Sequence, residues 1–177
     1  MSWFNRVGDL LKQYSSGGAA AAAAPAPDVH EHFDQVSQAA PSSVIAEGLA
    51  AAFRSNQTPA FGQMLTTLFT NSNGAQKAGM LNQLISSVNP AMLTQILSGA
   101  GLAGLAGGAG AQLTPEQAQK VSPETVQQLA AHAEKANPSV IDKLSSFYAQ
   151  HGALVKTLGG AALTVALAKV AERQKQG

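Results

Sequence analysis

Residues 113–150, LTPEQAQKVSPETVQQLAAHAEKANPSVIDKLSSFYAQ, contain the pattern that decides the fold class of this chain. A capping side chain stands directly before a proline three times, at Thr114-Pro115, Ser122-Pro123 and Asn137-Pro138. The capping oxygen accepts a free amide hydrogen of the first helical turn, and proline at the first helical position gives up a donor that has no partner there. Each pair therefore predicts the start of a helix.

The same pair occurs upstream at Thr58-Pro59 and Asn89-Pro90. Capping boxes are predicted from Asp28 with Glu31 and from Thr114 with Gln117. These signals and the apolar periodicity predict helices near residues 3–14, 28–39, 42–55, 59–71, 74–88, 90–98, 115–121, 123–136, 138–150 and 153–173. Alternating runs of β-branched residues, which would predict strands, are missing from the sequence. We therefore expect an all-α fold of short capped helices in one or two small bundles.

The first fourteen residues, MSWFNRVGDLLKQY, predict an amphipathic helix. Its large apolar side chains fall within roughly a third of the helix circumference; they are Trp3, Phe4, Val7, Leu10, Leu11 and Tyr14. Such a face must dock on another surface. That surface is either the rest of the chain, a second copy, a partner or a membrane.

Two low-complexity runs divide the rest of the chain. Together with the helices they predict the following organisation: an amphipathic docking helix at 1–14, a flexible Gly/Ala/Pro tether at 15–27, a helical module at 28–97, a Gly-rich linker at 98–112, and a second helical module at 113–177. The second module ends in a long apolar helix.

The apolar residues of that last helix point in nearly every direction. They include the candidate self-association residues Leu154, Leu158, Leu163, Val165, Leu167 and Val170. A helix that is apolar all round is usually buried on all sides or lies in lipid. Lys156 and Lys169 leave between them an uncharged stretch shorter than the roughly 20 residues that span a bilayer. Burial within its own domain, self-association and membrane contact all remain possible roles.

Charge and cysteine content exclude several classes of protein. The formal net charge is +1 and is spread evenly, whereas nucleic-acid binders usually carry a dense basic face. The chain contains no cysteine, which excludes disulfides, thiolate metal sites and a cysteine nucleophile. The alanine run at 19–24 is too weakly hydrophobic for the core of a secretory signal. We therefore expect a cytoplasmic protein.

No pattern in the sequence predicts catalysis. His30 and Asp34 are four residues apart and could share a helix face as metal ligands, but no second pair has ligand spacing. The sequence has no G-x-S-x-G motif and no evident carboxylate dyad. The glycines at 99–110 follow no predicted strand and precede no phosphate-loop lysine. We expect a non-enzyme with no catalytic residues, no metal and no cofactor.

The opening MSWFNRV, the short capped helices and the glycine-rich interruption together resemble the YidB-like bacterial proteins, which are all-helical. The resemblance implies a bacterial cytoplasmic protein without an assigned activity, and it carries over no site residues. The long C-terminal helix departs from the pattern of that family.

These observations predict a non-enzymatic helical interaction or scaffold protein that self-associates. The first alternative is a peripheral membrane protein that inserts Trp3, Phe4, Leu10 and Leu11. The second alternative is a helix-turn-helix nucleic-acid binder built from residues 115–150, with contacts from Gln127, Gln128 and Lys143. The positive charge of that segment is small, so nucleic acid is the weaker alternative.

Overall fold

A computed structural model gives the structure of residues 3–15, 27–105 and 112–176. All regular elements within those ranges are helical, so the predicted all-α class is confirmed. The predicted tether at 15–27 lies almost entirely outside the described residues.

The chain divides into two compact units. Unit 1 combines Met1–Ala60 with Ser145–Gly177, and unit 2 is the intervening Phe61–Leu144. This division differs from the predicted modules at 28–97 and 113–177. The reason is that helices on either side of the glycine-rich run pack on each other, which a local reading of composition does not reveal.

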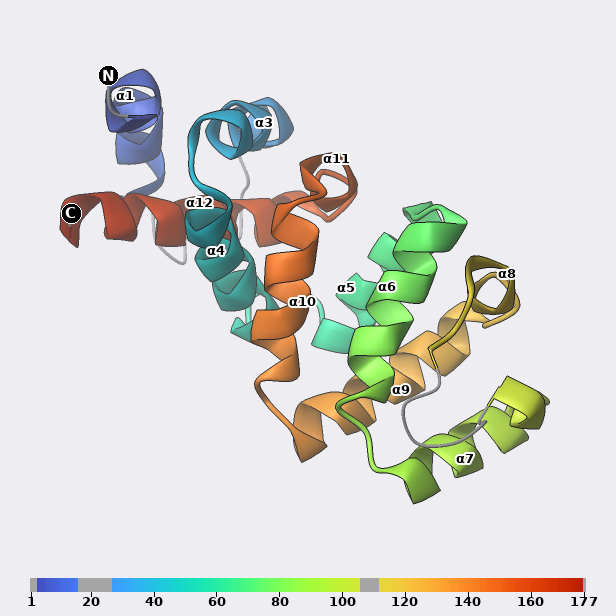
Figure 1. The fold of residues 1–177 in the computed structure, drawn as a ribbon. Helices are drawn as coiled ribbons and strands as arrows, with labels where there is room; N and C mark the ends of the chain where they lie inside the picture. The colour runs from blue at the N-terminus through green and yellow to red at the C-terminus, as the bar shows by residue number, and fades with distance from the viewer. Residues whose placement is uncertain (1–2, 16–26, 106–111, 177) are drawn as a thin grey trace. The chain divides into compact units, whose positions relative to one another are not determined.

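Unit 1 is organised around its C-terminal helix (Figure 1). Its elements are α1 (Trp3–Ser15), α3 (Val29–Ala39), α4 (Ser42–Arg54), α11 (Gly152–Val155), α12 (Gly160–Gln176) and the second half of α10 (Val140–Ala149). The helices α1, α3 and α4 all contact α12, and α4 contacts it most extensively. The apolar surface of α12 is therefore covered by its own unit.

The predicted helix at 153–173 is two helices in the structure. α11 ends at Val155, and α12 begins at Gly160. The hydroxyl of Thr157 donates to the Leu154 carbonyl at 2.6 Å, which closes the end of α11. The adjacent Gly159 and Gly160 then favour a break, because glycine is a poor residue for a helix interior.

Unit 2 is built from α5 (Phe61–Asn71), α6 (Gly74–Ile85), α7 (Pro90–Gly99), the short 3-10 helix η1 (Ala103–Leu105), α8 (Pro115–Ala118), α9 (Pro123–Ala136) and the first half of α10. The helix α9 lies against α5, α6 and α7, and α6 also contacts α8. The largest fully buried side chains of this unit belong to α5 and α6; they are Phe61, Leu65, Leu68, Phe69, Met80, Leu81 and Leu84.

Several of the predicted caps are present. Thr114 and Gln117 form a complete capping box at α8, and the Ser122 hydroxyl accepts the Thr125 amide at α9. Asn89 caps α7 by accepting the Ala91 amide. Because each cap joins residues only two or three positions apart, the sequence was sufficient to predict it.

Three other predicted starts differ from the structure. The hydroxyl of Thr58 donates to the carbonyls of Ala52 at 2.6 Å and Ser55 at 3.0 Å, so it closes the end of α4, and α5 begins only at Phe61. The carbonyl groups at the end of α4 therefore bind the Thr58 hydroxyl, which does not cap α5. Asp28 precedes α3 but makes no side-chain capping hydrogen bond. α10 begins at Val140, two residues after the predicted start at Pro138, but the predicted cap is present, because the Asn137 side chain accepts the Ser139 amide at 3.3 Å.

The first part of the predicted linker at 98–112 is an ordered helix end. α7 continues to Gly99, and Gly101 then adopts a φ of 75°, which favours glycine. The Leu102 amide donates to the Leu97 carbonyl at 2.7 Å, and the Gly101 amide donates to Ser98 at 3.1 Å. These are the two hydrogen bonds of a Schellman motif. Residues 106–111 of the predicted linker lie outside the described residues.

Candidate functional site

The docking helix α1 packs on its own chain, against α12 and α3. Val7, Leu11 and Tyr14 are buried there, whereas Leu10 is half-buried. The side chains of Trp3 and Phe4, the other predicted docking residues, lie outside the described part of the structure. The sequence left four surfaces open to this helix: the rest of the chain, a second copy, a partner or a membrane. The described apolar side chains of α1 pack on the rest of the chain.

Tyr14 also joins α1 to α3 through a polar contact. Its hydroxyl lies 2.6 Å from Nδ1 of His32, and the two rings meet edge to face with centroids 5.8 Å apart. Burial raises the pKa of Tyr14 above its ordinary value, and the nearby Asp28 carboxylate adds to that rise. The phenol therefore favours its neutral form, in which its hydroxyl can donate to the imidazole.

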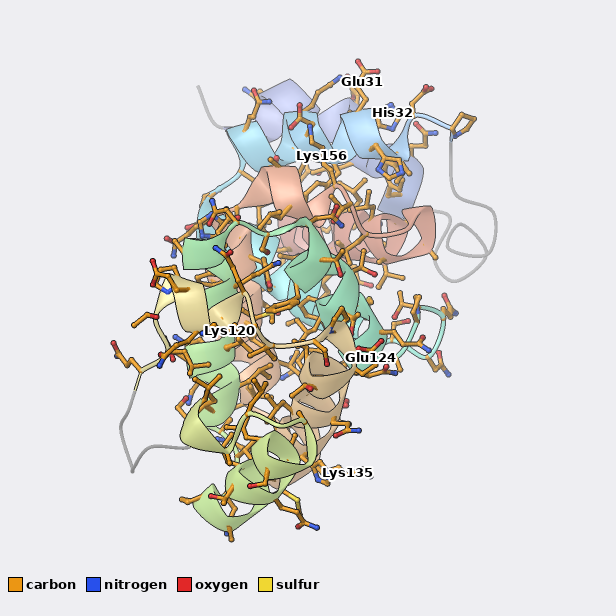
Figure 2. The ribbon with its side chains drawn as sticks, turned by 90° about the vertical axis from the view of Figure 1, so that its right-hand side faces the viewer. Glu31, His32, Lys120, Glu124, Lys135 and Lys156 are labelled. Atoms are coloured by element: carbon orange, nitrogen blue, oxygen red, sulfur yellow. The ribbon has the colours of Figure 1, made fainter. Side chains whose placement is uncertain are left out.

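His30 and Asp34, the metal-ligand candidates of the sequence, both bind Lys156. Nδ1 of His30 donates to the Lys156 carbonyl at 3.0 Å, and the Lys156 ammonium pairs with Asp34 at 3.2 Å. Figure 2 shows Lys156 together with His32 on this part of unit 1. Within the described residues, no group of three His, Cys, Asp or Glu side chains could hold a metal ion. Their role here is to connect α3 with α11.

The predicted self-association residues are mostly covered within unit 1. Five of them are buried, namely Leu154, Leu158, Leu163, Leu167 and Val170. Val165 alone among these six residues is half-exposed. Most of the predicted face is thus covered by the chain itself, because α4, α1 and α3 all pack on α12.

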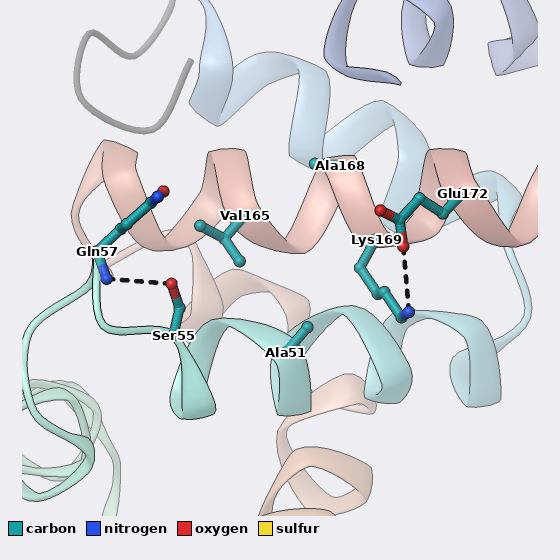
Figure 3. Close-up of a pocket in the computed structure, with 7 residues that line it drawn as sticks. All are labelled: Ala51, Ser55, Gln57, Val165, Ala168, Lys169 and Glu172. Atoms are coloured by element: carbon teal, nitrogen blue, oxygen red, sulfur yellow. Dashed lines mark hydrogen bonds and ion pairs between the residues drawn. The ribbon is translucent and has the colours of Figure 1, made fainter. Parts of the chain in front are cut away.

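Val165 lines an open groove between α4 and α12, with a volume of about 250 Å³ (Figure 3). The groove is lined by Ala51, Ser55 and Gln57 on one side and by Val165, Ala168, Lys169 and Glu172 on the other. Ala51, Val165 and Ala168 give it an apolar floor. It is the candidate functional site of this chain, and we call it the α4–α12 groove.

The geometry of the helix pair explains the groove. The two helices are antiparallel, since Glu47 near the start of α4 pairs with Arg173 near the end of α12 at 3.5 Å. They approach so closely that a Cβ atom on Gly48 would lie 2.7 Å from the carbonyl oxygen of Ala166. On the neighbouring outer face, the methyl groups of Ala51 and Ala168 are too short to fill the space between the helices.

Polar groups border the apolar floor at its two ends. At one end the Ser55 hydroxyl accepts the Gln57 amide at 3.1 Å. At the other end the Lys169 ammonium pairs with the Glu172 carboxylate at 3.1 Å, and these side chains are 45% and 59% exposed. The two ionisable groups of the lining are therefore paired with each other at the solvent-exposed border of the groove.

The sequence did not single out Ala51, Ser55, Gln57, Ala168 or Glu172. Val165, Ala168 and Glu172 are spaced by three and four residues, so they share one face of α12. That spacing could have marked the α12 side of the groove. Nothing local identifies α4 as its neighbour, because the two helices are joined only by long-range packing.

The residues proposed for nucleic-acid contact lie on two helices of unit 2. Gln127 and Gln128 are exposed on α9, and Lys143 is exposed on α10. For the membrane alternative, the described helices include none that is long and apolar enough to cross a bilayer.

Comparisons with protein-family models, with curated proteins and with solved structures find no match to this chain. The resemblance to the YidB-like proteins therefore stays a prediction from the sequence.

Proposed function

We propose that this chain is a non-enzymatic helical interaction protein that self-associates through the α4–α12 groove. The observation that carries the proposal is the open apolar floor of the groove with one cation and one anion at its border. The occupant is a second copy of the same chain.

The floor is shaped to receive a helix. Helices pack by placing the side-chain ridge of one into a groove on another, and short side chains permit a close approach. Ala51 and Ala168 are short, and Val165 provides apolar area that a partner would remove from water. The groove is open along one side, so a helix of a second copy can reach it without any rearrangement of unit 1.

The charges at the border favour a second copy over an unrelated partner. A two-fold symmetric interface uses the same patch on both subunits, so the patch must be complementary to itself. Lys169 and Glu172 supply both signs on one face of α12. In a symmetric dimer, Lys169 of each copy can then face Glu172 of the other.

The dimer should be weak. Exposed ion pairs contribute roughly 0–1 kcal/mol each, and stable interfaces bury about 1,200–2,000 Å² in total. A groove of about 250 Å³ accounts for a small part of such an area. We expect an equilibrium between monomer and dimer that depends on protein concentration and weakens as salt screens the charges.

A charge exchange tests the symmetric pairing. Lys169→Glu and Glu172→Lys should each weaken the dimer, because each places like charges opposite one another in the homodimer. A mixture of the two variants should regain dimer, because every cross-pair between them has opposite signs. Sedimentation equilibrium measures the three association constants, and absence of recovery in the mixture would refute the symmetric interface.

A second substitution tests the floor. Ala168→Gln fills the groove without adding charge, and it should lower the association constant. Ala153→Gln is the matched control, since Ala153 is exposed on α11 and does not line the groove. A wild-type chain that stays monomeric up to millimolar concentration, or equal association by both variants, would refute self-association through this groove.

A further inference from the structure

A second feature of the chain belongs to unit 2 and has no part in the α4–α12 groove. Between Lys77 and Glu116 the sequence has no Asp, Glu, Lys, Arg or His. About a quarter of the residues in an ordinary globular domain are charged. The charged residues of unit 2 that Figure 2 labels, Lys120, Glu124 and Lys135, all follow this stretch in the chain.

The uncharged stretch includes α7 and η1, whose apolar side chains are only partly covered. Ile96 and Leu97 are buried, and α7 packs on α9. Four further apolar side chains are half-exposed, namely Met92, Leu93, Leu102 and Leu105. The exposed positions of α7 between Pro90 and Gly99 carry Ala91, Thr94, Gln95 and Ser98. We call Pro90–Leu105 the α7–η1 surface.

Several backbone amides at the glycine-rich end of this surface are paired within it. The amides of Ala100, Gly101, Leu102 and Leu105 all donate to carbonyl groups within the same segment. A backbone amide without a partner is costly wherever water is scarce. The four internal hydrogen bonds therefore lower the cost of bringing this turn to the edge of an apolar medium.

We propose that the α7–η1 surface contacts the surface of a lipid bilayer, with Met92, Leu102 and Leu105 entering the boundary between headgroups and acyl chains. The contact is shallow, because the exposed face of α7 is polar and uncharged. This surface differs from the one that the membrane alternative placed on α1, where Val7, Leu11 and Tyr14 are buried within unit 1.

The distribution of charge favours lipid over another protein. Protein–protein interfaces are depleted of charge at their centre, but their rims are ordinary polar surface. Here the depletion extends over every exposed position of α7 and η1. A charge is costly to place among acyl chains, so the absence of charge from these positions suits a lipid contact.

The same absence predicts which lipids support binding. Attraction to anionic headgroups depends on Lys and Arg residues, and the α7–η1 surface has neither. On α9, which α7 contacts, Lys135 stands next to Glu134, so the pair adds no net charge. Binding should therefore be alike for zwitterionic and anionic vesicles and should persist at high salt.

Flotation of the full chain with small vesicles of pure phosphatidylcholine tests the proposal. We expect the chain to float, with little change when phosphatidylserine or salt is added. The double variant Ala91→Glu with Ala103→Glu should reduce the bound fraction at least about tenfold, because it places two charges at exposed positions of the surface. Ala75→Glu on α6 is the matched control and should float like the wild type, since Ala75 is also exposed.

Three results would overturn the proposal. The first is failure of the wild-type chain to float with phosphatidylcholine vesicles. The second is equal flotation of the double variant and its control. The third is a fall in solution mass of the double variant without vesicles, which would identify the surface as a protein contact. The Ala168→Gln variant of the groove should float normally, so failure of this proposal is distinguishable from failure of self-association.

Discussion

Gly48→Ala is the sharpest test of the packing in unit 1. A Cβ atom at this position would lie 2.7 Å from the carbonyl oxygen of Ala166 and 3.0 Å from Cγ2 of Val170. The first contact is with backbone in the middle of α12, so it cannot be relieved by rotation of a side chain. The helices α4 and α12 must separate by several tenths of an ångström to reach an ordinary contact distance.

The expected loss of stability follows from two opposing effects. Overpacking a well-packed core costs about 1–3 kcal/mol, and a backbone obstacle favours the upper part of that range. Alanine is about 1 kcal/mol better than glycine in a helix interior. Gly48→Ala should therefore lower the free energy of unfolding by about 1–2 kcal/mol, although the substitution improves helix propensity.

Urea unfolding followed by circular dichroism and tryptophan fluorescence measures this loss. Trp3, the one tryptophan of the chain, belongs to α1 in unit 1. Gly99→Ala at the end of α7 is the matched control, because a Cβ atom there meets nothing within 4 Å. That control should be neutral or slightly stabilising. A Gly48→Ala chain as stable as the wild type would show that α4 and α12 do not approach as described.

Three further predictions concern single side chains. Thr58→Ala removes the hydroxyl that closes the end of α4 and should lower the free energy of unfolding by about 1 kcal/mol. Thr58→Ser keeps the hydroxyl and should retain most of that stability in urea unfolding. An equal loss in both variants would show that the hydroxyl does not stabilise α4. Leu163→Asp buries an unpaired charge and should cost several kcal/mol, whereas Val165→Asp in the open groove should unfold at nearly the wild-type urea concentration. The raised pKa of Tyr14 means that its neutral form contributes stability below pH about 10 and that this contribution is lost as pH rises through the folded pKa. Tyr14→Phe should lose the hydrogen bond to His32 at neutral pH but show a shallower alkaline decline in melting temperature, and an unchanged decline would contradict the assignment.

The starts of several helices could be predicted because their causes are local. At Thr114, Ser122 and Asn89 the capping oxygen and the amide that it binds are two or three residues apart. Where a competing local partner exists, the same reasoning fails. Thr58 is an example, because its hydroxyl binds the carbonyl groups at the end of α4 and does not cap α5.

The amphipathic pattern of residues 1–14 required a docking surface, but it could not choose one. The structure buries Val7, Leu11 and Tyr14 against α3 and α12. Likewise, the all-round apolar character of the last helix left burial, self-association and lipid contact open. Most of this helix is buried within unit 1, mainly against α4. Because α4 lies more than a hundred residues earlier in the chain, the local sequence could not predict that contact.

By itself, the sequence determined the helical class and most helix starts, since these depend on propensity and on hydrogen bonds within one turn. Only the tertiary structure decided the division into units and the site. The glycine-rich run at 98–112 suggested a boundary, yet α6 and α8 pack across it. The α4–α12 groove exists because Gly48 allows a close approach to Ala166 while Ala51 and Ala168 leave space beside it. The groove therefore depends on which helices pack together, and no local pattern of residues specifies that two helices far apart in the chain will pack on each other.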